Sequence, residues 1–399
     1  MEGARQGDWM GNRVTRRFGV FYLLLFLPIG MQAPYLFLFF QRQGFTDSQL
    51  GTLAAVMPIM NVVSPPVWGA MADRLGDRRR MVVALLVASG LVFPWLLVVK
   101  SFAATLGLVI VFSAFALAPV AITDAMALEH VEREKGDYGR LRLWGSVGFA
   151  LPLLAFGLLL RKGAGESAAS LYPMFIGYAA FRLISAAWVG ALPASRGTSD
   201  GRFDWRAARA FTRPRFVALA ACAMVAVGAM SAYYLYFTIY LDQVGIADNL
   251  KGYFWAVGVA AETGMMLVIG RLIRRIGLKW TFVLSLAGCA LRLLAFSFPL
   301  SPAEIAAAQC LHALTFTAFT VSSIMFVNQL TPPHLRASGQ SVWAALTHGV
   351  GAATGSKMAG MATGTHGLLG MYRLFAIVAS VAMVAAAALV REPKDKEQS

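Results

Sequence analysis

The chain has 399 residues, of which 58% are hydrophobic and only 14% are charged, and its net charge is +15 at pH 7. About one-quarter of the residues in an average soluble domain are charged, so this composition argues against a soluble globular protein. The basic residues lie in short patches between long apolar runs rather than in one cluster, which argues against nucleic acid as a partner.

The apolar runs predict membrane-spanning helices. A helix of about 20 apolar residues crosses the hydrocarbon core, and in lipid all of its backbone groups must bond internally. The run at 18–40 is too long for the apolar part of a signal peptide, so we expect it to be the first span. The other spans are predicted at 48–70, 81–100, 103–128, 141–161, 170–192, 215–241, 249–272, 280–299, 302–330, 338–361 and 367–390. The sequence therefore predicts an all-α membrane protein with twelve transmembrane helices.

The longest polar connector, 193–214, divides these spans into two six-helix bundles at 18–192 and 215–390. Most of the 35 Lys and Arg residues lie in this linker and in the other connectors on the same side of the predicted membrane. Basic residues favour the cytoplasmic side, so the N-terminal segment 1–17, the linker and the tail 391–399 are expected in the cytoplasm. We expect a multi-pass protein embedded in the lipid bilayer of a bacterial inner membrane.

Two loops repeat each other half a chain apart. The sequence GAMADRLGDRR (69–79) follows the second predicted span, and GRLIRRIGLKW (270–280) follows the eighth. Four positions match at a single offset of 201 residues: Gly69 with Gly270, Arg74 with Arg275, Gly76 with Gly277, and Arg78 with Lys279. Repeats that each contain an even number of spans keep the same orientation, so the two bundles are predicted to be related by an axis along the membrane normal.

The first loop has the pattern G-x-x-x-D-R-x-G-x-R-R, made by Gly69, Asp73, Arg74, Gly76, Arg78 and Arg79. With this pattern, twelve spans and a central linker, the chain resembles the major facilitator superfamily of transporters. The resemblance implies that the loop is a conformational latch, in which Asp73 pairs with basic groups and stabilises one of two access states. A solvated basic loop would explain the arginines but neither the glycines nor the repeat. In the second loop Arg274 replaces the aspartate, so that copy is expected to latch less firmly or to use another acid.

Ionisable residues inside the predicted spans are the candidate functional residues. Each costs about 2.5–3.5 kcal/mol at the bilayer centre, and such residues usually face the protein interior or a water-filled cavity. Asp124 and Arg142 lie at a similar depth on adjacent antiparallel spans, so we expect them to pair. A purely structural pair is the alternative, although buried ion pairs are a weak source of stability. Arg182 is expected to have a structural role, either extending toward the membrane surface or pairing locally.

The stretch YGRLRLWGSVGFA (138–150) resembles the lactose-permease group of oligosaccharide:proton symporters. The resemblance implies that Asp124 and Arg142 occupy the positions of a substrate-binding acid and arginine. It places Phe149 where an aromatic ring stacks on the sugar. The acid in this chain is shorter and the aromatic ring is smaller, which argues against a galactoside as substrate.

Arg292 and His312 stand where the same group has its proton-coupling arginine and histidine. The two proton-linked acids of the group are absent, because Val259 and Thr315 occupy their positions. Glu262 lies three residues after Val259, about one helical turn away and on nearly the same face. We hypothesise that Glu262 is the relocated proton-binding acid, because an arginine that approaches it in only one state can drive proton release. A structural pair of Glu262 with Arg292 is the alternative.

Longer matches resemble the phenylpropionate-permease branch of the superfamily: TDAMA, DYGRLRLWGSVGF, AYYLYFTIY, GVAAE and LHALTF. In this branch an acid at the position of Glu262 is part of the pattern. Tyr233 and Tyr236, three residues apart in AYYLYFTIY, either line a substrate cavity or pack between helices. The substrate class stays open between an aryl carboxylate, a sugar and a nucleoside.

Together these features predict a secondary transporter that takes up a small organic solute with protons by alternating access. Proton-driven efflux of a drug or metabolite would use the same residues, and a sensor or scaffold that no longer transports is an alternative of another class. The sequence has no zinc-protease motif and no phosphate-binding loop, so no enzyme is predicted. The three cysteines lack metal-ligand spacing, so no metal site is predicted. We expect a functional monomer that needs no cofactor and uses the proton gradient as its driving force.

Overall fold

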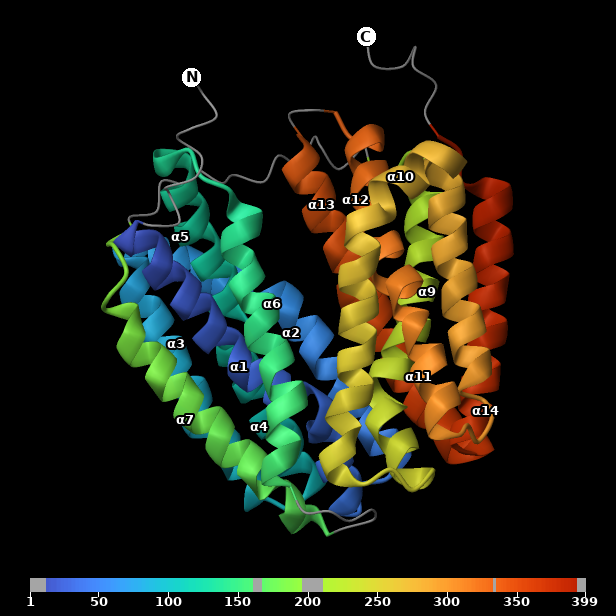
Figure 1. Cartoon of the computed structure of the whole chain (residues 1–399), viewed down its shortest axis with the longest axis horizontal. Coiled ribbons are helices and arrows are strands. Elements are labelled where there is room, and N and C mark those ends of the chain that lie inside the picture. Colours follow the sequence, from blue (N-terminus) through green and yellow to red (C-terminus); the bar gives the residue numbers. More distant parts are fainter. Residues whose placement is uncertain (1–11, 161–166, 196–210, 333–334, 393–399) are drawn as a thin grey trace. The chain divides into compact units, whose positions relative to one another are not determined.

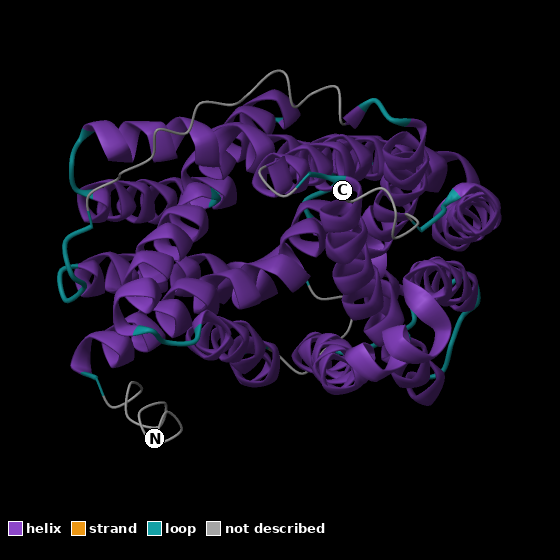
Figure 2. Ribbon diagram, turned by 90° about the horizontal axis from the view of Figure 1, so that it is seen from above, coloured by secondary structure: helices purple, strands orange, loops and turns teal. Residues whose placement is uncertain are grey.

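The computed structural model describes residues 12–160, 167–195, 211–332 and 335–392, and all regular secondary structure among them is helical (Figures 1 and 2). Residues 1–11 of the predicted N-terminal segment, 196–210 of the predicted linker and 393–399 of the predicted tail lie outside the described residues. The cytoplasmic position of these three segments stays a prediction.

The α-helices follow the apolar runs closely. Their bounds are α1 Arg13–Arg42, α2 Asp47–Arg74, α3 Arg78–Val92, α4 Phe102–Ala116, α5 Ala118–Glu134, α6 Tyr138–Ala155, α7 Tyr172–Val189, α9 Pro214–Gln243, α10 Asp248–Ala295, α11 Pro302–Cys310, α12 Phe319–Leu330, α13 Arg336–Ala344 and α14 Ala352–Leu389. Short helical segments of other geometry lie at Phe93–Leu97, Phe156–Leu159, Ala168–Leu171, Ala313–Ala318 and Ala345–Gly351. The last two are π-helices.

Within the described residues, nine helices are long and apolar enough to cross a membrane. Two of them each cover two predicted spans, because α10 runs through Gly277 and the helix Ser338–Leu389 runs through Gly367. Both glycines have positive φ, 83° and 69°, which reverses the chain direction at little steric cost. Helix α7 covers the predicted span at 170–192 but is not among the nine. The number twelve therefore stays a prediction, whereas the all-helical membrane fold is observed.

The described residues form two compact units, and each is stabilised by its own core. The first unit contains Met1–Gly44, Met60–Asp200 and Ala247–Gly252, and the second contains Phe45–Ile59, Gly201–Ile246 and Tyr253–Ser399. In the first unit the facing sides of α1, α3, α5 and α7 bury a cluster that includes Phe18, Phe21 and Leu85. In the second unit α9, α10, α12 and α14 bury a cluster that includes Phe282 and Phe326.

The first residues of α2 and of α10 each pack with the opposite half of the chain. The start of α2, to Ile59, belongs to the second unit, and the start of α10, to Gly252, belongs to the first. Backbones approach closely at both places. A Cβ atom on Gly51 would lie 2.9 Å from Gly360 Cα, and one on Gly252 would lie 2.0 Å from the carbonyl oxygen of Leu153. Only glycine fits at these two contacts.

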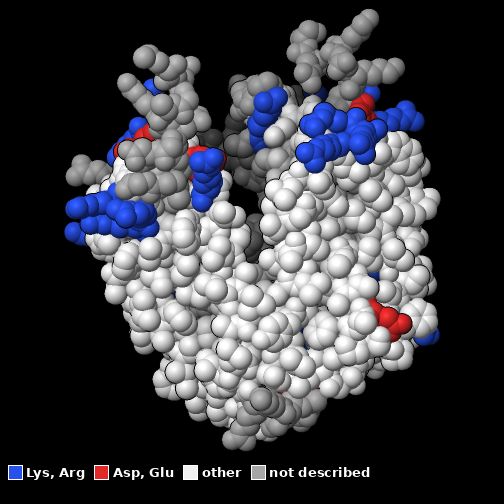
Figure 3. Space-filling model, in the orientation of Figure 1, with Lys and Arg blue, Asp and Glu red and all other residues white. Residues whose placement is uncertain are grey.

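Large apolar side chains cover the flanks of the helices. Leu158 and Leu267 are each 79% exposed, and Ile377, Val381 and Val384 are each more than half exposed. On the face drawn in Figure 3, most Lys and Arg side chains gather at one end of the helices, and the flanks are almost free of charge. A soluble monomer rarely exposes so much contiguous apolar surface, so these flanks face lipid.

Candidate functional site

A chain of three ionisable side chains lies in the interior of the second unit. Glu262 lies on the first half of α10, Arg292 lies on the second half beyond Gly277, and His312 immediately precedes the π-helix Ala313–Ala318. Arg292 Nη1 lies 2.9 Å from His312 Nδ1, and His312 Nε2 lies 3.5 Å from Glu262 Oε2. The imidazole therefore stands between the arginine and the acid.

These distances assign the tautomer of a neutral His312. A guanidinium can only donate, so His312 Nδ1 must accept from Arg292 and carry no hydrogen. The ring proton is then on Nε2, which faces the carboxyl group of Glu262. Among the described residues no Lys or Arg nitrogen lies within 4 Å of this carboxyl group. Glu262 thus reaches the positive charge of Arg292 only through the histidine.

Arg292 is held by neutral groups. Its side chain is 1% exposed, its Nη1 donates to Thr315 Oγ1 at 3.2 Å, and its Nη2 donates to Gln309 Oε1. The guanidinium carbon lies 3.8 Å from the ring centroid of Tyr233, close enough for a cation–π interaction. In the described part of the chain no carboxylate oxygen lies within 4 Å of Arg292, and its Nε has no hydrogen-bond partner. A buried cation with only neutral neighbours is costly, which favours a function that brings an anion to it.

A cavity of about 240 Å³ opens beside this group, also within the second unit. Thr315, Phe316 and Phe319 line it from the π-helix Ala313–Ala318 and the start of α12, and His348 lines it from the π-helix Ala345–Gly351. Such π-helical segments widen a helix locally and are frequent at functional sites. The remaining lining residues are small, apolar or hydroxylated: Ala226, Val227, Met230, Ser231, Tyr234, Ser285, Cys289, Thr320 and Ala352.

The sequence left Tyr233 and Tyr236 open between lining a cavity and packing between helices, and neither lines this cavity. A role of either residue in solute binding stays a prediction. Both are buried between helices, 1% and 0% exposed. Tyr233 donates to Gln309 Oε1 at 2.9 Å, and Tyr236 donates to Asp47 Oδ1 at 3.1 Å. Tyr234, between them, lines the cavity instead. In an apolar helix that is packed on several sides, spacing alone does not show which face a cavity occupies.

The first unit brings Asp124 and Arg142 together. Arg142 Nε lies 3.8 Å from Asp124 Oδ1, with both side chains about one-third exposed. Tyr22 donates to the same carboxylate oxygen at 2.7 Å, and Phe26 lies under the guanidinium, with its ring centroid 4.2 Å from Cζ. The sequence reasoning missed these two α1 residues, because nothing in the sequence showed which face of α1 meets α5 and α6.

Phe149 is half-buried on α6, and its backbone lies against α1. A Cβ atom on Gly30 would lie 2.2 Å from the carbonyl oxygen of Phe149. No ring contact of Phe149 defines a binding surface in the described residues, so its stacking role stays a prediction.

The loop between α2 and α3 has the geometry expected of a compact turn. Asp73 accepts from Arg78 Nε at 2.9 Å, and Gly76 has a φ of 70°. Arg79 donates to the carboxylate of Asp77 and, through Nη1, to the carbonyl of Leu192. The Arg79 hydrogen bond is the main reason why the pKa of Asp77 lies below its usual value. Gly69 has open space around it, and Arg74 ends α2.

The second copy of the loop keeps the turn and bonds to a different acid. Gly277 has a φ of 83°, which matches Gly76. The backbone N–H of Lys279 donates to Glu392 Oε1 at 2.6 Å, so an acid from the end of the chain caps this helix start. Asp77 has the same capping role in the first copy, where it accepts from the backbone N–H of Arg79.

Comparisons with known proteins agree with this architecture. The model of the MFS_1 like family matches residues 15–374. The chain is 25% identical over 337 residues to the maltose permease of Geobacillus stearothermophilus, covering 84% of each chain. It is 25% identical over 316 residues to the probable 3-phenylpropionic acid transporter of Escherichia coli (strain K12), covering 78% of this chain and 82% of that one. The crystal structure of the nucleoside transporter NupG has the same fold, with a TM-score of 0.82, 18% identity, and coverage of 96% of this chain and 100% of that chain.

The family match spans most of the chain, the relatives are permeases and transporters, and the apolar helix flanks face lipid. The chain is therefore a multi-pass integral membrane protein that belongs to the MFS_1 like family of the major facilitator superfamily.

Proposed function

We propose that the chain is a secondary active transporter that carries a small organic solute together with protons by alternating access. The observation that carries the proposal is the arrangement Glu262–His312–Arg292, in which an acid and a buried arginine are kept apart by a neutral imidazole. A purely structural pair would place the carboxylate directly on the guanidinium, because that contact best offsets the cost of burying both charges.

Charge balance in this site couples the proton to the solute. With Arg292 positive and Glu262 ionised, the group is neutral overall. An anionic solute drawn to Arg292 adds one negative charge in a low-dielectric interior, where uncompensated charge is expensive. Protonation of Glu262 restores neutrality, and the imidazole of His312 stands between the acid and the arginine. A solute anion and a proton therefore bind more favourably together than either does alone.

The cavity favours an aryl carboxylate among the three substrate classes. Its lining contains no carboxylate, carboxamide, Lys or Arg side chain among the described residues. A sugar or a nucleobase needs such groups to satisfy its many donors and acceptors, because buried polar groups without partners are costly. Phe316, Phe319 and Tyr234 offer aromatic surface for a ring, and Thr315 links the cavity to Arg292. The similarity to the probable 3-phenylpropionic acid transporter supports the same class.

Residues of the first unit are proposed to take part in solute binding as well. Arg142 is held between Asp124 and the ring of Phe26, which leaves part of its guanidinium exposed. Such an arginine can bind a carboxylate or a hydroxyl group.

Alternating access also requires a defined topology. We propose twelve spans with both termini in the cytoplasm of a bacterial cell and the Asp73 loop on the cytoplasmic side. The repeat of this loop at Gly277, with the same left-handed glycine, supports two parallel halves. Pairing of Asp73 with Arg78 is proposed to stabilise one access state.

Purified protein in proteoliposomes tests the function directly. We expect an inwardly directed proton gradient to drive accumulation of 3-phenylpropionate, and no accumulation when an ionophore collapses the gradient. A thermal-shift series should show stabilisation by 3-phenylpropionate and none by maltose or uridine at the same concentration. Accumulation that ignores the pH gradient would reject proton coupling, and stabilisation by maltose or uridine alone would reject the aryl carboxylate.

Thr315 is expected to link Arg292 to the bound solute by hydrogen bonding. The change Thr315→Val keeps the shape of this cavity-lining residue but removes the hydroxyl group that accepts from Arg292. We expect affinity for 3-phenylpropionate to fall about tenfold or more, since a hydrogen bond to a charged group contributes roughly 1.5–3 kcal/mol. The matched control is Thr320→Val, which removes the hydroxyl group of another cavity-lining residue; among the described residues this hydroxyl group makes no hydrogen bond to Arg292. Equal losses in both variants, measured by titration calorimetry, would show that Thr315 has no special role.

A further inference from the structure

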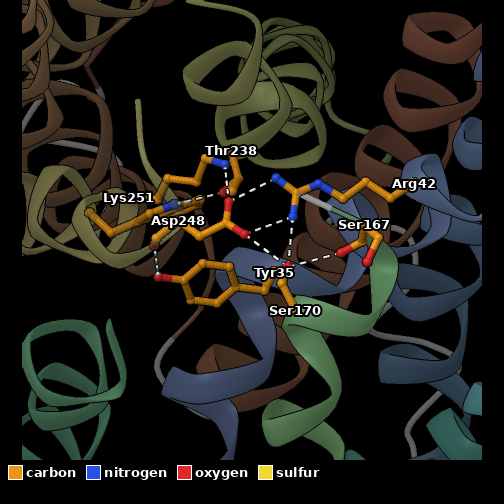
Figure 4. Close-up of polar contacts among 8 residues, drawn as sticks. Tyr35, Arg42, Ser167, Ser170, Thr238, Asp248 and Lys251 are labelled. Atoms are coloured by element: carbon orange, nitrogen blue, oxygen red, sulfur yellow. Dashed lines mark hydrogen bonds and ion pairs between the residues drawn. The ribbon is translucent and has the colours of Figure 1, made fainter. Parts of the chain in front are cut away.

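A second cluster of buried charges lies in the first unit, at the start of α10 (Figure 4). Asp248 and Lys251 are fully buried, and Arg42 at the end of α1 is almost so. Arg42 binds Asp248 with both arms of its guanidinium, Nη1 at 2.7 Å and Nη2 at 2.8 Å, and Lys251 Nζ lies 2.5 Å from the same carboxylate. Tyr35 donates to the backbone carbonyl of Asp248 at 3.4 Å.

The repeat places a related contact in the second unit. The offset of 201 residues that relates Gly69 to Gly270 also relates Tyr35 to Tyr236 and Asp47 to Asp248. Tyr236 donates to the backbone carbonyl of Asp47 at 3.4 Å and to its carboxylate at 3.1 Å. In each case the tyrosine comes from the first helix of one half and the aspartate from the second helix of the other half. The two contacts are therefore equivalent under the repeat.

The cations are not repeated. At the same offset, Gln243 corresponds to Arg42 and Leu50 corresponds to Lys251. The nearby Lys357, on α14, bonds to Thr52 Oγ1 at 2.7 Å and to Ser48 rather than to the carboxylate of Asp47. No Lys or Arg nitrogen of the described chain lies within 4 Å of that carboxylate.

Both contacts lie at the helix ends opposite the Asp73 loop and its repeat. Helix α2 runs for 28 residues from Asp47 to the loop after Arg74, and α10 likewise begins at Asp248 and continues toward the repeated loop at Gly277. Each contact joins helices from different halves of the sequence. In the proposed alternating access the two halves separate at these helix ends, which would break both contacts. A bidentate arginine–carboxylate contact with a second cation is stronger than a tyrosine hydrogen bond.

We propose that this end closes through two unequal contacts, one at Asp248 that includes two cations and one at Asp47 that rests on a tyrosine hydroxyl group. The start of α2 then separates before the start of α10, and opening is stepwise. Arg42, Lys251 and Asp248 are positioning residues that stabilise the closed end. The proposal rests on alternating access but not on proton coupling or on any particular substrate.

Two cysteine reporters at repeat-equivalent positions test the proposal. Ser48→Cys and Asn249→Cys, 201 residues apart, are introduced separately into the full chain with its three native cysteines replaced by alanine. The rate of N-ethylmaleimide labelling is measured in nanodiscs and normalised to the rate in unfolded protein. Arg42→Gln should raise labelling at position 249 about tenfold or more, because it leaves Asp248 without its bidentate partner. The same change should alter labelling at position 48 by less than about twofold.

Tyr236→Phe is the reciprocal variant, and it should raise labelling at position 48 only a few-fold, with little effect at position 249. Lys251→Met provides a second change at the charged contact if Arg42→Gln does not give monodisperse protein. Equal increases at both positions in every variant would mean that the end opens as one rigid body, which would overturn the proposal. Because the labelling assay needs neither a substrate nor a pH gradient, the proposed transport function can fail without affecting this test.

Discussion

Glu262→Gln is expected to abolish proton-driven accumulation of solute while downhill exchange continues. The glutamine keeps the size and hydrogen-bonding capacity of the side chain but cannot gain or lose a proton. The site then stays in the state that corresponds to a neutral Glu262, so solute binding and release no longer depend on a proton. The measurement is uptake of labelled 3-phenylpropionate by proteoliposomes, first with an imposed pH gradient and then with unlabelled solute inside and no gradient.

Two controls make this result specific. Glu304→Gln removes another α-helical glutamate, which caps the start of α11 and lies away from the site, and it should leave accumulation unchanged. Glu262→Asp keeps an acid and should retain part of the coupling. Normal accumulation in Glu262→Gln would exclude this residue as the proton carrier, and loss of exchange together with accumulation would indicate a structural role instead.

Arg292→Gln is expected to remove most of the affinity for an anionic solute. Arg292 is buried, has neutral partners, and places a positive charge next to Thr315, which lines the cavity. Loss of one member of a buried charge pair costs roughly 2–5 kcal/mol, so we expect binding to weaken about 30-fold or more. Titration calorimetry with 3-phenylpropionate and with its uncharged amide gives the comparison. The amide should bind the variant and the unmodified protein with similar affinity.

Stability separates this effect from misfolding. The guanidinium has no carboxylate within 4 Å among the described residues, so its removal leaves no unpaired acid behind and should not lower the melting temperature strongly. Arg292→Lys keeps the positive charge but loses the guanidinium donors to His312 and Thr315. Its affinity for 3-phenylpropionate should therefore lie between those of Arg292→Gln and the unmodified protein. Equal weakening for the acid and the amide would show that Arg292 shapes the cavity rather than recognising charge.

Much of the fold could be read from the sequence because the relevant interactions are local. A run of apolar residues in lipid must form a helix, since only a helix satisfies its own backbone within one segment. The turns at Gly76 and Gly277 were marked by their positions in a repeated loop, and both glycines have the positive φ that such turns require. The pairing of Asp124 with Arg142 was expected because such residues are costly in lipid unless they find partners, whereas the association of Arg292 with His312 was implied by the resemblance to the lactose-permease group.

Other parts of the site depended on residues for which the sequence signal was weak. Gln309 bonds to both Arg292 and Tyr233, and its position three residues before His312 on the same helix face was an available clue. No sequence pattern pointed to the cluster around Asp248, in which the structure buries both Arg42 and Lys251. Their burial depends on a contact between residues 206 positions apart, which no local pattern encodes.

The sequence by itself determined the all-helical membrane architecture, the repeat and the set of charged residues that needed partners. The reason is that backbone hydrogen bonding and the free-energy cost of a charge in lipid act on each segment separately. The tertiary structure alone decided that Tyr234 rather than Tyr233 or Tyr236 lines the cavity. It also decided that Asp248 contacts two cations, whereas no Lys or Arg of the described residues lies within 4 Å of the Asp47 carboxylate. These features depend on how each helix is rotated about its axis. In helices that are apolar on every face, the contrast between polar and apolar sides is too small to fix that rotation before the helices pack.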